Sequence, residues 1–581
     1  MSLIALTIND KKVYVDEGST ILDAAKRLNI KIPTLCHLNM HDGKTTNHPG
    51  SCRVCVVEVE GRRNLAPSCC TPATNGMVVK TNSIRAIKAR RTVLELILSD
   101  HPQDCLLCEK NTACELQKLA AELGIREIHY KGEMSTYPID HSSSSIVRNL
   151  DKCILCRRCE TVCNEIQTVG AISAVGRGFE TVVSTAFSLP IGETTCTFCG
   201  KCVSVCPTGA LTEVNNTSKV WNALGQTEKV VVVQTAPAVR AALGEEFGLE
   251  HGTSVTGKMV AALKALGFTK VFDTDFAADL TIMEEASEFA HRLQHGGKLP
   301  MLTSCCPAWV NFFEHQFSDL LDIPSTCKSP QQMWGAVAKT YLAGKMNIEA
   351  KDMIVVSVMP CLAKKYEATR PEMSTNGVPD VDIVISTREL AKMIKEAGIN
   401  FNSLPEEDFD NPLGESTGAG VLFGTSGGVM EAALRTAYEW LTNETLENVD
   451  FEVVRGMEGI KEASVKINDI DVKVAIASGL GNARKLLEAI RAGEADYHLI
   501  EIMACPGGCI NGGGQPYSTG YEDILEKRMS VLYNEDKNKT IRKSHDNPYI
   551  KKIYEEFLGE PYGEKAHELL HTHYVSRNNI T

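Results

Sequence analysis

The sequence predicts a multidomain protein that is α+β in its N-terminal part and α/β from about residue 216 onward. The chain has 581 residues, which is too many for one hydrophobic core. Its 22 cysteines gather in groups with short spacings rather than spreading evenly. After residue 216, apolar runs typical of buried strands alternate with helical patterns, which indicates parallel sheets, and more than one of them.

The composition narrows the class of protein further. The formal net charge of −13 argues against nucleic acid or an anionic membrane as a partner. The sequence has no apolar run of about 18 residues, so no membrane span is expected. The stretch MSLIALTINDKKVYV has no signal-peptide pattern, so we expect a cytoplasmic protein whose cysteines serve metal or redox sites. Zinc is the simplest alternative, but the cysteine spacings are those of iron–sulfur ligands.

Residues 1–80 are expected to form a small β-grasp domain of the [2Fe–2S] ferredoxin type. Two alternating runs around an Asn-Asp turn predict a hairpin, and Ser19 is expected to cap the helix that follows. A single cysteine, a C-x-x-C pair and a distant fourth cysteine match plant-type [2Fe–2S] spacing with altered loop lengths. Cys69 is preferred to Cys70 because it stands three residues before a proline, as in related domains. The expected ligands are Cys36, Cys52, Cys55 and Cys69.

Residues 81–143 are expected to begin with a helix and to carry a [4Fe–4S] cluster. The helical pattern SIRAIKARRTVLELILSD is followed by HPQDCLLCEKNTAC. A histidine near cysteines is usually a bystander, but the H-x3-C-x2-C-x5-C spacing favours ligation by one imidazole and three thiolates. The expected ligands are His101, Cys105, Cys108 and Cys114.

Residues 144–215 contain an internal repeat, because CILCRRCETVC and CTFCGKCVSVCP both read C-x2-C-x2-C-x3-C. This is the pattern of a bacterial ferredoxin with two [4Fe–4S] clusters, in which the fourth cysteine of each run serves the other cluster. One cluster is therefore expected on Cys153, Cys156, Cys159 and Cys206, and the other on Cys163, Cys196, Cys199 and Cys202.

Residues 216–581 are expected to form one large α/β domain. The run GVLFGTSGG is predicted to be a strand, and GTSGG and SGLGN are predicted to be tight strand-to-helix turns, since neither has the spacing of a phosphate-binding loop. Any nicotinamide chemistry would therefore need a partner. The cysteines of this region follow strands, where α/β sheets build their sites. Four of them, Cys306, Cys361, Cys505 and Cys509, suffice for a further [4Fe–4S] cluster and leave Cys305 over.

Three motifs of this region, TSCCPAW, MPCLAKKYE and EIMACPGGCINGGGQP, resemble the active-site signatures of the [FeFe]-hydrogenases. The resemblance covers essentially the whole chain, including the order of the accessory cluster motifs. It implies an H-cluster, which is a [4Fe–4S] cubane joined through one cysteine, here Cys509, to a diiron subsite with CO, cyanide and azadithiolate ligands. It also implies one [2Fe–2S] and three [4Fe–4S] accessory clusters and a C-terminal H-cluster domain.

The resemblance also assigns roles to side chains around the H-cluster. It implies that Cys305 faces the diiron subsite and passes protons along a relay of Glu285, Ser325, Glu288 and Arg292. Taken alone, the two glutamates would be read as a solvated acidic helix face. Lys364 is expected to donate to a cyanide ligand. The expected neighbours of the cluster are Ala236, Pro237, Gln331, Met359 and Met503, although either methionine could instead be part of the hydrophobic core.

The expected activity is reversible H2 chemistry, 2H+ + 2e– ⇌ H2, with electrons relayed by the accessory clusters. Ferredoxin, flavin and small iron–sulfur subunits like those of NADH dehydrogenase, and H-cluster maturation proteins are the expected partners. Two outer clusters favour a multimeric, electron-bifurcating hydrogenase linked to NAD(P), and a stand-alone ferredoxin hydrogenase is the nearest competing interpretation. An H2 sensor, an electron-transfer or cluster-assembly scaffold, and the related large subunit of respiratory NADH dehydrogenase compete less strongly.

Overall fold

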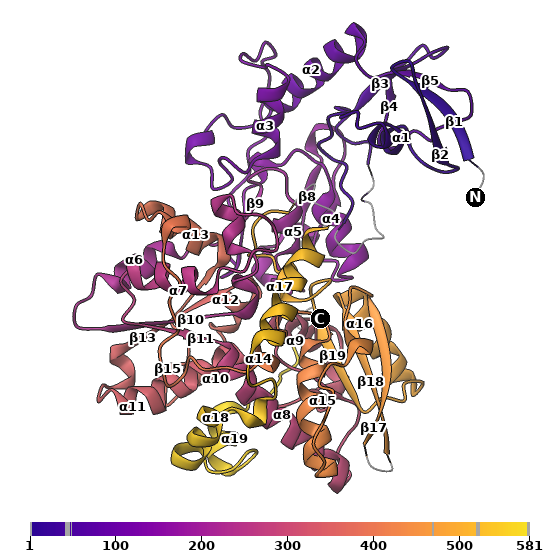
Figure 1. Cartoon of the computed structure of the whole chain (residues 1–581). Coiled ribbons are helices and arrows are strands. Elements are labelled where there is room, and N and C mark those ends of the chain that lie inside the picture. The colour runs from indigo at the N-terminus through magenta and orange to yellow at the C-terminus, as the bar shows by residue number, and fades with distance from the viewer. Residues whose placement is uncertain (1–2, 41–46, 48, 468–469, 519–522, 578–581) are drawn as a thin grey trace.

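The computed structural model describes residues 3–40, 47, 49–467, 470–518 and 523–577. Figure 1 shows a small N-terminal part, in indigo, set on top of a much larger body that contains the later residues. The cysteine-rich segments in purple lie between the two. The order of the chain in space therefore follows its order in sequence, from the N-terminal sheet down to the large α/β body.

The N-terminal sheet has the strand order β2-β1-β5-β3-β4. Strands β1 and β2 form the expected hairpin, and Asn9 and Asp10 both have positive φ, as a tight hairpin turn requires. The predicted cap at Ser19 is wrong by one residue, because the Thr20 hydroxyl accepts from the N–H of Asp23 at 3.2 Å and the Asp23 carboxylate accepts back from Thr20. The elements are β1 (Leu3–Ile8), β2 (Lys11–Asp16), α1 (Ile21–Arg27), β3 (Val56–Val59), β4 (Ala66–Pro67) and β5 (Val78–Lys80).

The middle of the chain is built from short elements around the cysteine motifs. The expected helix appears as α2 (Ile84–Ser99), whose buried Arg90 donates to the carbonyl of Val56 at 2.9 Å and so ties the helix to β3. Strand β6, before the first half of the cysteine repeat, pairs antiparallel with β9, after the second half. Strands β7 and β8 form a second antiparallel pair between the two halves. The elements are α3 (Glu115–Glu122), β6 (Ile146–Arg148), α4 (Arg158–Thr161), β7 (Ser173–Val175), β8 (Val182–Ser184), α5 (Lys201–Val205) and β9 (Leu211–Glu213).

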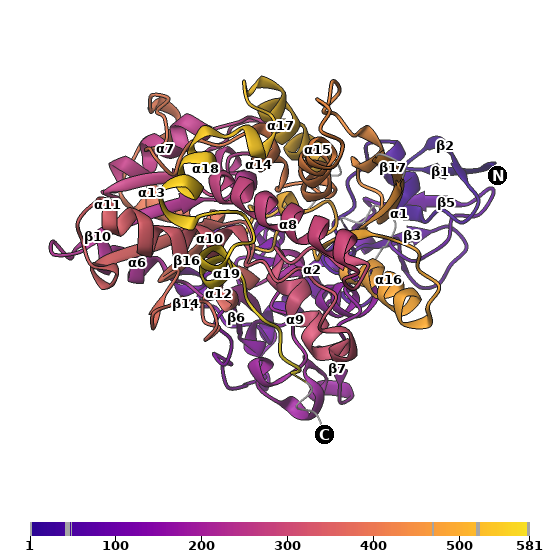
Figure 2. The same cartoon turned by 90° about the horizontal axis from the view of Figure 1, so that it is seen from below.

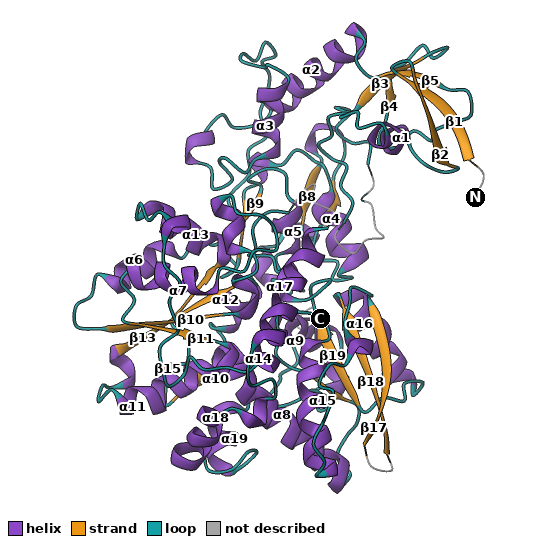
Figure 3. Cartoon of the chain, viewed as in Figure 1, coloured by secondary structure: helices purple, strands orange, loops and turns teal. Residues whose placement is uncertain are grey.

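The large C-terminal body contains two four-stranded sheets with helices packed around them (Figure 3). The first has the order β11-β10-β13-β16 and is parallel throughout, and the second has the order β12-β19-β18-β17, with only β17 antiparallel. The strands are β10 (Val230–Thr235), β11 (Lys270–Asp273), β12 (Met301–Leu302), β13 (Met353–Met359), β16 (Ile383–Ser386), β17 (Ile460–Ile467), β18 (Ile470–Ser478) and β19 (Leu499–Met503).

The long helix α8 lies between the two sheets in both views (Figures 1 and 2). It carries the glutamates of the expected relay into the interior, where most of its residues are buried. The helices around the sheets are α6 (Thr217–Leu224), α7 (Thr256–Ala265), α8 (Asp275–His295), α9 (Pro307–Gln316), α10 (Pro330–Val337), α12 (Ala363–Glu367), α13 (Thr387–Glu396), α14 (Gly418–Leu422), α15 (Gly428–Thr442), α16 (Leu480–Ala492), α17 (Ile524–Asn538), α18 (Pro548–Ile553) and α19 (Glu564–Leu570).

The predicted strand GVLFGTSGG is wrong, because its first residues belong to α14 and GTSGG is a helix-to-helix turn before α15. A glycine permits this packing, since a Cβ at Gly420 would lie 2.5 Å from the carbonyl oxygen of Asp275 on α8. The turn binds a carboxylate from the protein itself, because Glu501 accepts from the N–H groups of Gly427 and Met430 at 2.6 and 2.7 Å. SGLGN is the predicted strand-to-helix turn, between β18 and α16.

Among the described residues, no helix combines the length and the apolar character that crossing a bilayer would require.

Candidate functional site

Four buried cysteines lie together beside the N-terminal sheet. The Sγ atoms of Cys55 and Cys69 are 3.3 Å apart, and hydrogen bonds with the thiols of Cys52 and Cys69 lower the pKa of Cys36. Cys70 points outward and is exposed. This arrangement fits a [2Fe–2S] cluster held by the four buried thiols, with Cys70 outside it.

The structure places His101 at the end of α2, next to the loop that carries Cys105, Cys108 and Cys114. The imidazole is 8% exposed, and its Nδ1 has no hydrogen-bond partner. A buried polar atom without a partner is costly unless something else binds it. The Cys108 sulfur also packs closely against the ferredoxin unit, since a Cβ at Gly209 would lie 2.6 Å from it. These features fit ligation of a cluster by the imidazole and three thiols.

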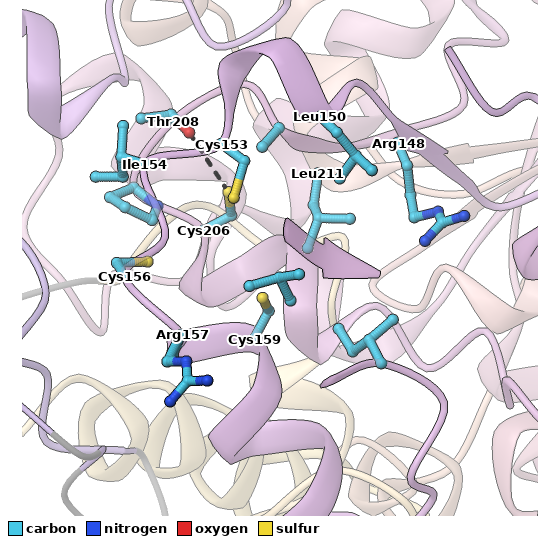
Figure 4. Close-up of a pocket in the computed structure, with 14 residues that line it drawn as sticks. Arg148, Leu150, Cys153, Ile154, Cys156, Arg157, Cys159, Cys206, Thr208 and Leu211 are labelled. Atoms are coloured by element: carbon cyan, nitrogen blue, oxygen red, sulfur yellow. Dashed lines mark hydrogen bonds between the residues drawn. The ribbon is translucent and has the colours of Figure 1, made fainter. Parts of the chain in front are cut away.

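The cysteine repeat lines two separate cavities. A cavity of about 460 Å³ is lined by Cys153, Cys156, Cys159 and Cys206, which surround one space in Figure 4. A second cavity, of about 360 Å³, is lined by Cys163, Cys196, Cys199 and Cys202. The structure thus brings the fourth cysteine of each run to the other run's first three. Each cavity and donor set fits one [4Fe–4S] cluster.

One arginine joins the three cysteine-rich units. Arg158 is 1% exposed and donates to both carboxylate oxygens of Glu115 at 2.7 and 2.9 Å. It also donates to the backbone carbonyls of Cys36 and His37 at 3.4 and 3.3 Å. Its own helix follows Cys156, so the loop of the first unit, the helix α3 and the first ferredoxin cavity meet at this guanidinium.

The largest of these cysteine-lined cavities, about 590 Å³, lies where strands of both C-terminal sheets end. Cys305 and Cys306 follow β12, Cys361 follows β13, and Cys509 follows β19, and all four line it. Cys505 is buried beside them, and charges on Cys306, Cys505 and Cys509 add to burial in raising the pKa of Cys361. Such crowded thiols fit an iron–sulfur cluster, whose irons replace the protons. The sequence-predicted neighbours Ala236, Pro237, Gln331, Met359 and Met503 line the same cavity.

Hydrogen bonds to neighbouring residues hold the polar groups of this cavity in place. The Lys364 ammonium donates to Glu367 at 3.0 Å and to the carbonyl of Cys305 at 3.1 Å. Burial disfavours this ammonium, but the charges of Glu367 and Cys361 outweigh it and raise the pKa of Lys364. Gln331 donates to the same Glu367 carboxylate at 3.0 Å, while its side-chain amide oxygen Oε1 is buried without a partner among the described residues. The cavity therefore holds a positioned cation and a free acceptor.

The thiol of Cys305 and the carboxyl of Glu285 form the inner part of the expected relay. Burial, followed by the charge of Glu285, raises the pKa of Cys305 well above its ordinary value, so the group stays a thiol. Burial and the charge of Glu288 raise the pKa of Glu285 to about 8. Ser325 is the next group, since its hydroxyl donates to Glu288 at 2.9 Å and interacts with Glu285 as well.

The outer part of the relay runs from Glu288 to Arg292, one turn along α8. Arg292 donates to Glu288 at 2.5 Å and to the carbonyls of Ile323 and Pro324 at 2.9 and 2.8 Å. The Glu288 side chain is 2% exposed and that of Arg292 is 11% exposed. The five predicted groups therefore lead from the cavity toward the protein surface.

Sequence reasoning missed a second layer around Glu288. Thr326 donates its N–H to Glu288 at 3.0 Å, and its hydroxyl lies 2.7 Å from Nδ1 of His571. Nε2 of His571 lies 3.0 Å from Glu284, which is also bonded to Tyr554. Cys327, whose sequence context indicates only core packing, is buried at this place and adds its thiol to the same layer.

The raised pKa of Glu285 leads to a pH-dependent effect on stability. The group's ordinary value is 4.5 and its folded value is about 8. A raised folded pKa gives stability that is present below pH 4.5 and is lost as the pH rises to about 8. We expect wild type to lose stability relative to Glu285→Gln over this range, by on the order of a few kcal/mol. Thermal midpoints of both proteins across the range measure the difference, and parallel profiles would contradict it.

Family models match the chain along most of its length. Residues 229–513 match the C-terminal domain of the iron-only hydrogenase large subunit, and residues 522–577 match the iron hydrogenase small subunit. Before them come a 2Fe-2S iron-sulfur cluster binding domain at 2–83, the NADH-ubiquinone oxidoreductase-G iron-sulfur binding region at 90–129, and a 4Fe-4S dicluster domain at 152–210. The cluster-binding motifs thus match families of the expected kind, in the expected order.

Relatives match the whole chain. It is 63% identical to the NADP-reducing hydrogenase subunit HndD of Solidesulfovibrio fructosivorans, with 100% of both chains covered. It is 41% identical to iron hydrogenase 1 of Clostridium pasteurianum, with 98% of this chain and 99% of the relative covered. A solved apo [FeFe]-hydrogenase HydA1 from Chlamydomonas reinhardtii aligns at 46% identity with a TM-score of 0.57, covering 62% of this chain and 99% of that one. The chain therefore belongs to the [FeFe]-hydrogenases and is a member that carries 2Fe-2S and 4Fe-4S binding domains before its catalytic domain.

Proposed function

We propose that this hydrogenase interconverts protons and H2 at the cavity between the two C-terminal sheets. The observation that carries the proposal is the convergence there of a proton relay and a crowded set of thiols. Cys306, Cys361, Cys505 and Cys509 would hold a cubane, with Cys509 also bound to a diiron subsite that carries CO, cyanide and azadithiolate. When bound, that H-cluster supplies the two-electron chemistry of H2.

The side chains of the protein hold and move the protons. Cys305 presents a protonated thiol to the cavity, and Glu285 can return a proton to it because its raised pKa keeps it protonated at neutral pH. Ser325 passes the proton between Glu285 and Glu288, and Arg292 holds Glu288 in place at the outer end of the relay. Lys364 uses the N–H that Glu367 and Cys305 leave free to orient an anionic ligand of the cluster.

We infer four units, at residues 1–80, 81–143, 144–215 and 216–581, with one [2Fe–2S] and three [4Fe–4S] accessory clusters. Electrons would reach the first ferredoxin cluster from both outer clusters, continue to the second, and then enter the cubane. The contacts of Arg158 support this branched route, because they bring segments of three units to one buried guanidinium.

We further propose that the outer clusters exchange electrons with partner subunits that bind flavin and NADP(H), and with ferredoxin, so that the complex is electron-bifurcating. The name of the S. fructosivorans relative, a subunit of an NADP-reducing hydrogenase, supports the nicotinamide link. Maturation proteins would install the diiron subsite. The grouping of the cysteines as cluster ligands supports a reducing cytoplasm as the location.

The test is H2 evolution from reduced methyl viologen by anaerobic full-length protein supplied with the diiron subsite. We expect sustained turnover by wild type. If the protein carried the complete H-cluster and barely turned over, an H2 sensor would be the better account. If it bound iron–sulfur clusters but took up no diiron subsite, an electron-transfer or assembly scaffold would replace the proposal.

A further inference from the structure

Lys201 is a buried lysine whose hydrogen-bond partners are neutral oxygens. It is 3% exposed, and its ammonium donates to two neutral oxygens of Asn511, the backbone carbonyl at 3.0 Å and Oδ1 at 2.8 Å. Within the part of the chain that the structure describes, Lys201 forms no salt bridge. Burying a charge is costly unless a neighbour of opposite sign compensates it. A buried ammonium at this position would therefore be stabilised by any negative charge that a bound cluster brings.

Both ends of this contact belong to cluster-binding loops. Lys201 stands between Cys199 and Cys202, which line the second ferredoxin cavity. Asn511 follows Cys509 by two positions in the loop of the catalytic cavity. Lys201 is close enough to interact electrostatically with Cys199 and Cys505, one thiol from each cluster site.

The two loops are packed against each other without room for side chains. A Cβ at Gly513 would lie 2.8 Å from the carbonyl oxygen of Cys199 and 2.8 Å from the Cα of Gly200. A third segment reaches the ferredoxin unit nearby, since Asn311 of α9 donates its side-chain amide to the carbonyl of Cys196 at 3.0 Å. The ammonium of Lys201 is therefore enclosed between the second ferredoxin cluster site and the cubane site.

We propose that Lys201 is a positioning residue for electron transfer, holding one positive charge between these two clusters and favouring the reduced state of both. Reduction adds one electron and one negative charge to a cluster and changes no bond. A fixed cation nearby stabilises that added charge, more strongly in a buried site than in water. Lys201 would thus make the second ferredoxin cluster and the cubane better electron acceptors than they would be without it. The inference rests on the cluster assignment proposed above.

The test compares Lys201→Met, which keeps most of the side-chain volume and removes the charge, with wild type and Lys201→Arg. Reduction potentials of the accessory clusters and the cubane are measured by redox titration followed by EPR, in full-length protein without the diiron subsite. After the diiron subsite is added, the infrared bands of its CO and cyanide ligands show which of the titrating clusters is the cubane. In Lys201→Met, we expect the equilibrium constants for reducing the cubane and the second ferredoxin cluster to fall on the order of tenfold. For one electron, this lowers each reduction potential by about 59 mV. Lys201→Arg should retain wild-type potentials.

Lys219→Met is the matched control, because Lys219 is an exposed lysine of the same part of the chain and should leave every potential unchanged. Unchanged cubane and second-cluster potentials in Lys201→Met would overturn the proposal, and so would equal shifts in all the clusters. If Lys201→Met does not retain its clusters, Lys201→Gln, which can still donate to Asn511, is judged by the same two outcomes. These titrations need no H2 turnover, so they can fail or succeed independently of the proposed activity.

Discussion

Replacing Cys305 with alanine should lower H2 evolution at least ~100-fold while leaving the iron content of the protein unchanged. The thiol lines the catalytic cavity, and burial together with the charge of Glu285 keeps it protonated. Alanine occupies the same place and cannot carry a proton. The adjacent Cys306 is expected to behave differently, since its replacement removes a ligand and should cost iron.

The measurement is methyl viologen-driven H2 evolution at matched iron content, with infrared bands of CO and cyanide to verify the diiron subsite. Cys70→Ala is the control for loss of a thiol, because Cys70 is exposed and stands between β4 and β5 of the N-terminal sheet. Wild-type turnover by Cys305→Ala would remove this thiol from the proton route.

Glu288→Gln should have the second largest effect, a loss of about 100-fold in turnover with the clusters intact. The amide fills the same volume, but it cannot accept a proton from Ser325 and hand it on toward the surface. Arg292 would lose its charged partner at 2.5 Å, so the exit of the relay would also be less well ordered. H2 evolution and the solvent isotope effect measure the change.

The neighbouring Glu284 offers a matched control on the same helix. It is also fully buried, but it accepts from Tyr554 and Tyr562 and, among the described residues, is linked to Glu288 only indirectly, through His571 and Thr326. We expect Glu284→Gln to lower the thermal midpoint and to leave turnover per intact cluster near the wild-type value. Equal losses of turnover in both variants would mean that the effect of Glu288→Gln is structural.

Most of the site could be predicted from local sequence because its ligands come in short, fixed spacings. The two ferredoxin runs even predicted the exchange of their fourth cysteines, and the structure groups Cys206 with the first run. The cap at Thr20 was also within reach, because Asp23 stands three residues after Thr20 and no acidic residue stands three after Ser19.

Other features depend on contacts between distant segments. Thr326 and His571 are 245 positions apart, and no spacing rule joins them. The helix α14 replaced a predicted strand because Gly420 fits against Asp275 of α8 and because the Thr417 N–H, just before the helix, donates to Asp279 at 2.9 Å. Lys201 looks like a surface lysine of a ferredoxin motif until the loop of Asn511 covers it.

The close contact of Gly200 and Gly513 with neighbouring backbone and side chains has a consequence for electron tunnelling, whose rate falls exponentially with the width of the gap. A methyl group at Gly513 would meet the Cys199 carbonyl at 2.8 Å and would wedge the two cluster loops apart. These glycines therefore keep the distance between the ferredoxin unit and the catalytic centre as short as backbone packing allows. Any larger residue there would slow electron delivery even if every iron ligand remained in place.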